Sequence, residues 1–121
     1  MRTKFIANQN RTEAGFHLLV ILSLSDGSSS KTESAVLIDF LDTTFSGTLD
    51  LIKEQAFLMA LPREEYDNHF SEVAAHFLSI STIEDRHKLL EFAMKVIMAD
   101  KSVDAEENRF VNMLYDLWDM G

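Results

Sequence analysis

Five acidic side chains occupy matching places in two short polar stretches of the chain. They are Asp26, Glu33, Asp100, Asp104 and Glu107. Each stretch lies between two segments with helical periodicity, so the carboxylates are expected near helix N-termini, where backbone N–H groups are free. Carboxylate oxygens are the ligands that hard divalent cations such as Ca²⁺ and Mg²⁺ prefer. One interpretation of this pattern is therefore a divalent-cation site.

The same residues also fit a purely structural role as helix caps. Asp104 and Glu107 have the spacing of a capping box, and Ser30 and Glu33 have the same spacing in the first stretch. A good N-cap stabilises a helix by about 0.5–2 kcal/mol and requires no metal. The residues alone leave both interpretations open.

Motifs exclude several other classes of site. Counted from Asp100 as an EF-hand loop, position six is Ala105 where glycine is needed, and position twelve is Val111 where a glutamate is needed. The chain has no GxSxG, P-loop, GxGxxG or HExxH motif. It also has no cysteine, which excludes disulfides and a cysteine nucleophile. We predict no catalytic residues and no enzymatic activity.

The four histidines are expected at the boundary of the core. His69 and His76 are seven positions apart, whereas zinc sites on one helix usually use an i, i+4 pair. His17 and His87 stand alone in the sequence. We interpret all four as structural side chains that each make one hydrogen bond.

The charge and composition limit the classes of molecule that the chain is expected to bind. The chain has 121 residues, 46% of them hydrophobic, and a formal net charge of −9. This charge disfavours nucleic acid and anionic lipid as direct partners and is compatible with cations or basic protein surfaces. No apolar run is long enough to span a bilayer, so we expect no direct membrane insertion and a cytoplasmic protein.

Helical periodicity runs through almost the whole chain and no stretch alternates like a strand. Residues 1–11 are predicted to be an N-terminal tail, and 12–121 a single all-α domain, a compact bundle of about six helices. Thr12 is expected to cap the first helix, and Leu49, Ile52, Ala56 and Met59 share one side of the third. The predicted helices cover about 12–24, 31–45, 48–61, 62–78, 82–99 and 105–119.

The two acidic stretches also align with one another. A shift of 74 positions places Asp26 on Asp100 and Glu33 on Glu107, with apolar residues aligned on both sides. We interpret this as an internal duplication of a helix–loop–helix unit, related by a pseudo-two-fold axis. Methionine and aromatic residues gather near the C-terminus, which predicts core packing or, alternatively, a Met-rich groove for a protein partner.

These features resemble the TerB-like family, the tellurite-resistance-associated domain. The similarity covers roughly residues 16–118. The matching pieces are Leu24-Ser25-Asp26-Gly27 with Glu33, and Met98-Ala99-Asp100-Lys101 with Val103, Glu106 and Glu107. Two departures accompany them: Lys101 stands where the family usually has glycine, and the first loop has serines where acidic residues are common.

The resemblance implies an all-helical, non-enzymatic scaffold of the stress response. It implies that Asp26, Glu33, Asp100 and Glu107 bind a divalent cation, Ca²⁺ or Mg²⁺, and that no other cofactor is needed. It also implies a protein partner, including a membrane-associated complex that would hold the chain at the periphery of the inner membrane. The alternative is a pure protein-interaction module without metal, in which the acidic residues are caps.

Overall fold

The computed structural model describes residues 9–25, 31–45, 47–99 and 109–119. These residues form six α-helices and one short 3₁₀ helix, and no strand occurs among them. The all-α prediction is confirmed. The helices are α2 (Arg11–Ser25), α3 (Lys31–Thr44), α4 (Leu51–Ala60), η1 (Arg63–Glu65), α5 (Tyr66–Ile80), α6 (Ile83–Ala99) and α7 (Arg109–Trp118).

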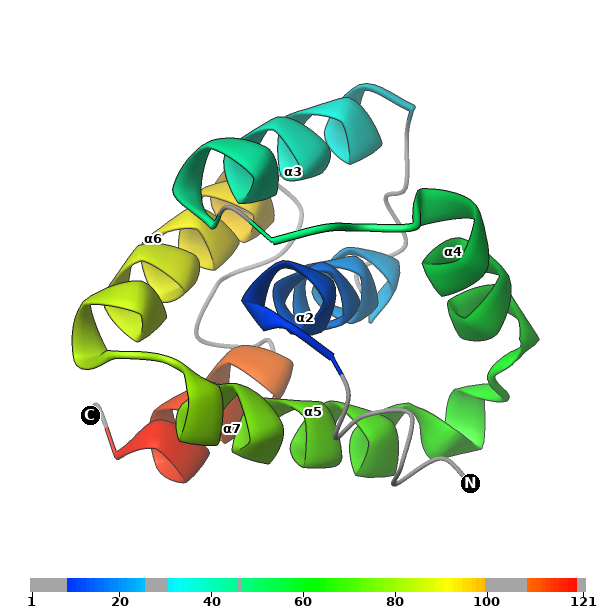
Figure 1. Ribbon diagram of the computed structural model, residues 1–121. Coiled ribbons are helices and arrows are strands. Elements are labelled where there is room, and N and C mark those ends of the chain that lie inside the picture. Colours follow the sequence, from blue (N-terminus) through cyan, green and yellow to red (C-terminus); the bar gives the residue numbers. More distant parts are fainter. Residues whose placement is uncertain (1–8, 26–30, 46, 100–108, 120–121) are drawn as a thin grey trace.

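Helix α2 forms the centre of the bundle. Figure 1 shows it nearly end-on, with α3, α4, α5 and α6 around it. Its apolar residues cover most of the helix circumference, which requires burial on all sides. The most deeply buried of them are Ala14, Phe16, Leu18, Leu19, Ile21 and Leu22. Gly15 allows close packing here, since a Cβ atom at this position would lie 3.0 Å from Leu41 Cδ2.

Helices α5 and α7 pack together through aromatic side chains. Phe77 stacks on Trp118 with ring centroids 5.3 Å apart, and Phe70 lies 4.8 Å from Phe110. The Trp118 indole N–H also donates to the Ala74 carbonyl at 2.9 Å. These contacts bury the apolar side of α5, which carries Phe70, Val73, Ala74 and Phe77.

The first helix is capped by Asn10, so the predicted Thr12 cap is wrong. Asn10 Oδ1 accepts from the Glu13 N–H at 2.8 Å, and Glu13 Oε1 accepts from the Asn10 N–H at 2.9 Å, which is a reciprocal capping box. Thr12 lies one turn inside. Its hydroxyl donates to the Phe45 carbonyl and accepts from the Gly47 N–H, which joins α2 to the segment after α3.

Helix α4 does not bury the side that carries Ile52 and Met59; it buries the opposite side. Ile52 is 82% exposed and Met59 is 86% exposed, whereas Glu54 is 1% exposed and Leu58 is 2% exposed. The helix begins at Leu51, because Asp50 Oδ1 accepts from the Lys53 N–H and caps it there. A carboxylate therefore enters the core while two large aliphatic side chains face solvent.

Candidate functional site

Three of the four predicted cation ligands lie outside the described residues. These are Asp26, Asp100 and Glu107. Glu33 lies in the first turn of α3, and only its backbone is described. Among the residues that the structure describes, no three His, Asp or Glu side chains are grouped so that they could hold a metal ion. The acidic cation site therefore stays a prediction, and its four carboxylates fit a hard cation by donor chemistry.

The helices that bracket the two acidic stretches are described, and they correspond in pairs. Helix α2 ends at Ser25 and α6 ends at Ala99, while α3 ends at Thr44 and α7 at Trp118. Each pair of ends is separated by the shift of 74 positions that aligns the two stretches. The bounds of these helices are thus compatible with a duplicated hairpin, which itself stays a prediction.

The core contains a chain of three titratable side chains from three helices. His17 on α2 lies between His69 on α5 and Glu54 on α4. His17 Nδ1 is 2.8 Å from His69 Nε2, and His17 Nε2 is 2.7 Å from Glu54 Oε1. The two histidines are 0% exposed and Glu54 is 1% exposed. The prediction that His17 stands alone at the core boundary is therefore wrong, and so is the boundary position of His69.

Aromatic and amide groups complete the surroundings of this buried cluster. The Phe57 ring lies 5.6 Å from the His17 ring and 5.1 Å from the His69 ring, measured between centroids. The Gln9 side-chain amide donates to Glu54 Oε1 at 3.4 Å. A buried carboxylate is costly without hydrogen-bond donors, and His17 and Gln9 supply them here. The arrangement can hold and shift a proton, but its burial prevents contact with a substrate.

Sequence reasoning missed Glu54, although a signal for it existed. Glu54 precedes Leu58 by one helical turn, so both residues lie on the same side of α4. His17 carried a second signal, because a helix that is apolar nearly all round must bury any histidine that it contains. What the sequence does not reveal is that the two side chains meet, since they are 37 positions apart.

The remaining two histidines lie elsewhere. His76 is half-buried and its Nε2 lies 2.8 Å from the Gln9 carbonyl, as expected for a boundary histidine with one hydrogen bond. His87 is exposed on α6. It borders an open groove of about 570 Å³ lined by His87, Leu90, Glu91, Met94, Lys95 and Tyr115.

The C-terminal methionine and aromatic cluster serves mainly as core, with one part facing this groove. Phe110 and Trp118 are buried, and Met113 packs against the core. Met94 and Tyr115 are half-buried and also line the groove between α6 and α7. Both interpretations of the cluster therefore keep some support, although core packing accounts for most of its described members.

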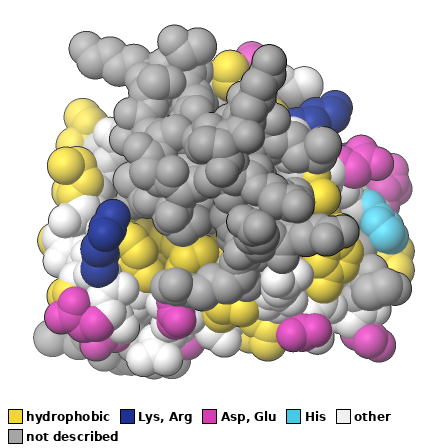
Figure 2. Space-filling model, turned by 180° about the vertical axis from the view of Figure 1, so that it is seen from behind, with side chains coloured by type: hydrophobic (Ala, Val, Ile, Leu, Met, Phe, Trp, Pro, Cys, Tyr) yellow, Lys and Arg dark blue, Asp and Glu magenta, His cyan; other side chains and the backbone are white. Residues whose placement is uncertain are grey.

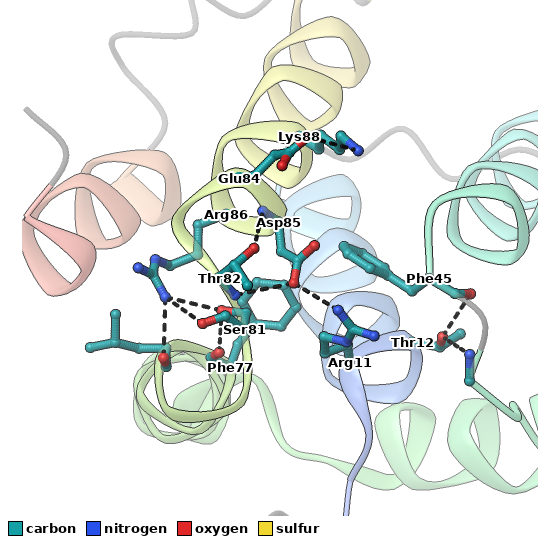
Figure 3. A network of polar contacts seen from close by, with 12 residues as sticks. Arg11, Thr12, Phe45, Phe77, Ser81, Thr82, Glu84, Asp85, Arg86 and Lys88 are labelled. Carbon is teal, nitrogen blue, oxygen red and sulfur yellow. Dashed lines mark hydrogen bonds and ion pairs between the residues drawn. The ribbon is translucent and has the colours of Figure 1, made fainter.

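A second polar network joins the first turns of α2 and α6. Arg11 Nη1 donates to Asp85 Oδ2 at 2.8 Å, and the same carboxylate accepts from the Thr82 N–H at 3.1 Å (Figure 3). The Thr82 hydroxyl in return accepts from the Asp85 N–H, so Thr82 caps α6, which begins one residue after the predicted start. Burial raises the pKa of Asp85, but the Thr82 amide and the Arg11 guanidinium outweigh it and hold the pKa below its usual value.

On the face of the molecule shown in Figure 2, the described acidic side chains do not form one continuous patch. Acidic side chains are spaced along the rim of that face, and hydrophobic side chains are exposed at its left edge, the side on which α4 lies (Figure 2). In the described part of the chain, no helix combines the length and the apolarity that crossing a bilayer requires.

Comparison with known proteins gives one match. The model of the family described as tellurite resistance protein TerB matches residues 12–120. No curated protein and no solved structure matches the chain. The match covers nearly the whole sequence and includes both acidic stretches and all six described α-helices apart from the first residue of α2. The chain therefore belongs to the tellurite resistance protein TerB family.

Proposed function

We propose that this chain is a non-enzymatic helical scaffold of the stress response that binds a divalent cation, Ca²⁺ or Mg²⁺, and a protein partner. The ligands would be Asp26, Glu33, Asp100 and Glu107. The observation that carries the proposal is that two helix pairs, α2/α3 and α6/α7, each bracket one acidic stretch inside the region that matches the TerB family. Carboxylates beside helix ends supply hard oxygen ligands for such an ion.

The packing of the helices favours a shared role for the two stretches. Helix α2 contacts both α3 and α6, and α6 contacts α7, so the four bracketing helices form one connected group. Figure 1 shows α2 running away from the viewer and the C-terminal part of α6 passing behind α3. Both acidic stretches therefore start from helices that run towards the far side of the bundle, as two halves of one site would require.

The cation is tested by calorimetric titration of chelator-treated protein with Ca²⁺, Mg²⁺ and Zn²⁺ in turn. We expect saturable binding of one ion and a rise in melting temperature, since a ligand at 100 times its Kd stabilises by about 2.7 kcal/mol. The double variant Asp26→Asn/Asp100→Asn should lose both effects. Asp42→Asn, an exposed carboxylate on α3, is the matched control and should keep them. Absence of heat and of a melting shift with every ion would refute the cation.

The protein partner is supported by charge and by exposed aliphatic side chains. A net charge of −9 favours a partner with a basic surface. The exposed side chains of Ile52 and Met59 on α4 provide apolar area that such a partner could contact. A partner in a membrane-associated complex would place this chain at the cytoplasmic face of the inner membrane. Salt-dependent capture of a basic partner that is lost in Ile52→Lys/Met59→Lys would support this part of the proposal.

The alternative is a protein-interaction module that binds no metal. Lys101 favours it, because its positive charge next to Asp100 opposes cation binding. In this case Asp104 and Glu107 act only as a capping box. Asp104→Ala would then lower the free energy of unfolding by about 1 kcal/mol, equally with chelator and with added ion. A cation site instead predicts that Asp100→Asn, at a proposed ligand, costs more stability when the ion is present than with chelator.

An enzymatic role has little support. The described acid–base groups with the closest mutual contacts are His17, His69 and Glu54, and burial of all three keeps substrate away. General acid–base catalysis requires a group within hydrogen-bond reach of the substrate. This buried cluster therefore fits a role inside the scaffold.

A further inference from the structure

The buried cluster of His69, His17 and Glu54 joins α5, α2 and α4 through groups whose hydrogen bonding depends on protonation. The neutral imidazole of histidine has one donor and one acceptor nitrogen, and an ionised carboxylate only accepts. With Glu54 ionised, His17 Nε2–H donates to it, and His17 Nδ1 accepts from His69 Nε2–H. Every contact at 2.7 and 2.8 Å then pairs one donor with one acceptor.

One additional proton can be accommodated in this chain. If His17 becomes an imidazolium, its Nε2–H donates to Glu54 and its Nδ1–H donates to His69 Nε2. A second additional proton cannot. On His69 it puts N–H groups on both sides of the contact between His17 Nδ1 and His69 Nε2, which are 2.8 Å apart. On Glu54 it removes the negative charge that compensates the buried His17 imidazolium. Two adjacent imidazolium rings would also repel each other at a site that is buried from the surface.

The groups that face His17 come from each surrounding segment. Helix α4 contributes Glu54 and the Phe57 ring, α5 contributes His69, and the segment before α2 places the Gln9 amide on Glu54. Glu54 supplies the negative charge that faces His17 and compensates one proton. A second proton would leave the cluster with a net positive charge inside the core, which is costly.

Helix α4 is the element that would separate first. Its described buried side chains are Glu54 and Leu58, and Ile52 and Met59 on its outer side are exposed. Helices α2 and α5, in contrast, share extensive packing with each other, and α5 also packs against α7. Local opening occurs where buried apolar contacts are fewest, so rupture of the cluster releases α4 before the rest of the bundle.

We propose that His17, His69 and Glu54 form a pH-sensitive latch that holds α4 against α2 and α5 at neutral pH and releases it when the cluster takes up a second proton. Histidine is the residue whose charge ordinarily changes between about pH 5 and 8, so acidification in this range is the stimulus. Release uncovers Phe57 and Leu58, and therefore changes the surface that the scaffold presents to a partner.

Amide hydrogen exchange of the full chain tests the latch. Protection factors, corrected for the intrinsic effect of pH on exchange, are measured for α4 and α6 at about pH 7.5 and about pH 5. We expect the protection of α4 to fall about ten-fold or more while that of α6 is unchanged. His69→Gln should abolish this fall, because glutamine does not titrate. His87→Gln, which removes an exposed histidine on α6, should retain it.

The ¹⁵N resonances of the imidazole rings give a second measurement on the unmodified protein, which serves if His69→Gln does not fold. The pH at which α4 loses protection should coincide with the pH at which the second of the two rings becomes doubly protonated. A parallel loss of protection in α4 and α6 would overturn the proposal. So would a fall in α4 protection that persists in His69→Gln or that occurs while both rings keep their neutral-pH protonation.

Discussion

Arg11 and Asp85 form an ion pair of 2.8 Å between the first turn of α2 and the first turn of α6. The two residues are 74 positions apart, the same shift that aligns the two acidic stretches. Residues that correspond in the proposed duplication thus contact each other at the start of their helices. This is the arrangement expected near a pseudo-two-fold axis, where equivalent positions of two copies meet.

The Asp85 carboxylate should make stability depend on pH in the acid range. Its pKa is lowered from the ordinary value of 3.8, so the folded state binds this proton less tightly than the unfolded chain does. The resulting stabilisation is present above pH 3.8 and is lost as the pH falls through the lower folded value. Asp85→Asn should therefore reduce the free energy of unfolding near neutral pH, with the difference from the unmodified protein shrinking below pH 3.8.

Urea unfolding at a series of pH values checks this, with Glu84→Gln as the control. Glu84 is the preceding residue, is 76% exposed and pairs with Lys88 at 3.5 Å on the surface. Such pairs contribute about 0.5 kcal/mol or less, so the control should follow the unmodified protein at every pH. An Asp85→Asn difference that grows on acidification would contradict the role assigned to this ion pair.

Replacing His17 alone should destabilise the fold far more than replacing His17 and Glu54 together. His17→Leu leaves the Glu54 carboxylate buried without its imidazole partner, and breaking a buried ionic contact in this way costs about 3–5 kcal/mol. His17→Leu/Glu54→Leu removes the orphaned charge and should recover most of that loss. A double-mutant cycle from urea unfolding measures the coupling. Additive effects of the two substitutions would show that the contact contributes little.

Gly47→Ala should weaken the junction between α2 and α3. A Cβ atom at this position would lie 2.8 Å from Asn10 Cγ, which forces the Asn10 side chain to move. That side chain caps α2 through the Glu13 N–H and also donates to the Thr48 carbonyl at 2.9 Å. We expect a loss of about 1 kcal/mol, the usual cost of a lost N-cap. In an Asn10→Ala background, Gly47→Ala should have much less effect, and an undiminished effect would exclude this clash as the cause.

The helical class of the fold could be predicted because period and composition agree along the chain. Continuous 3.6-residue periodicity with one proline and four glycines leaves little alternative to a helical bundle. The bounds of α6 were also predicted to within one residue, and its start coincides with a capping box between Thr82 and Asp85, which is a local signal. The start of α2 was missed although the same kind of signal was present. Thr12 and Asn10 are both acceptable caps, but only Asn10 is followed three positions later by a glutamate, Glu13, which completes a capping box.

The buried cluster could not be predicted for a different reason. Its members lie on three helices, and His17 and His69 are 52 positions apart. Local propensity indicates that each residue is in a helix but not which side chains meet across the core. Glu54 was also missed because Ile52 and Met59 form an aliphatic side on α4, and such a side is normally expected to be the buried one. In the structure that side is exposed. The carboxylate enters the core because His17 and Gln9 provide its donors there.

This orientation of α4 is itself open to test. Met59→Lys should change the free energy of unfolding by no more than about 0.5 kcal/mol, because the side chain is exposed and substitutions at such positions are usually neutral. Leu58→Ala, one residue away, should cost about 2–5 kcal/mol, because it creates a cavity beside the buried cluster. Thermal and urea unfolding of the two variants give the comparison. If Met59→Lys were the more damaging change, α4 would be rotated by roughly one residue step, about 100° at 3.6 residues per turn, and Glu54 could not reach His17.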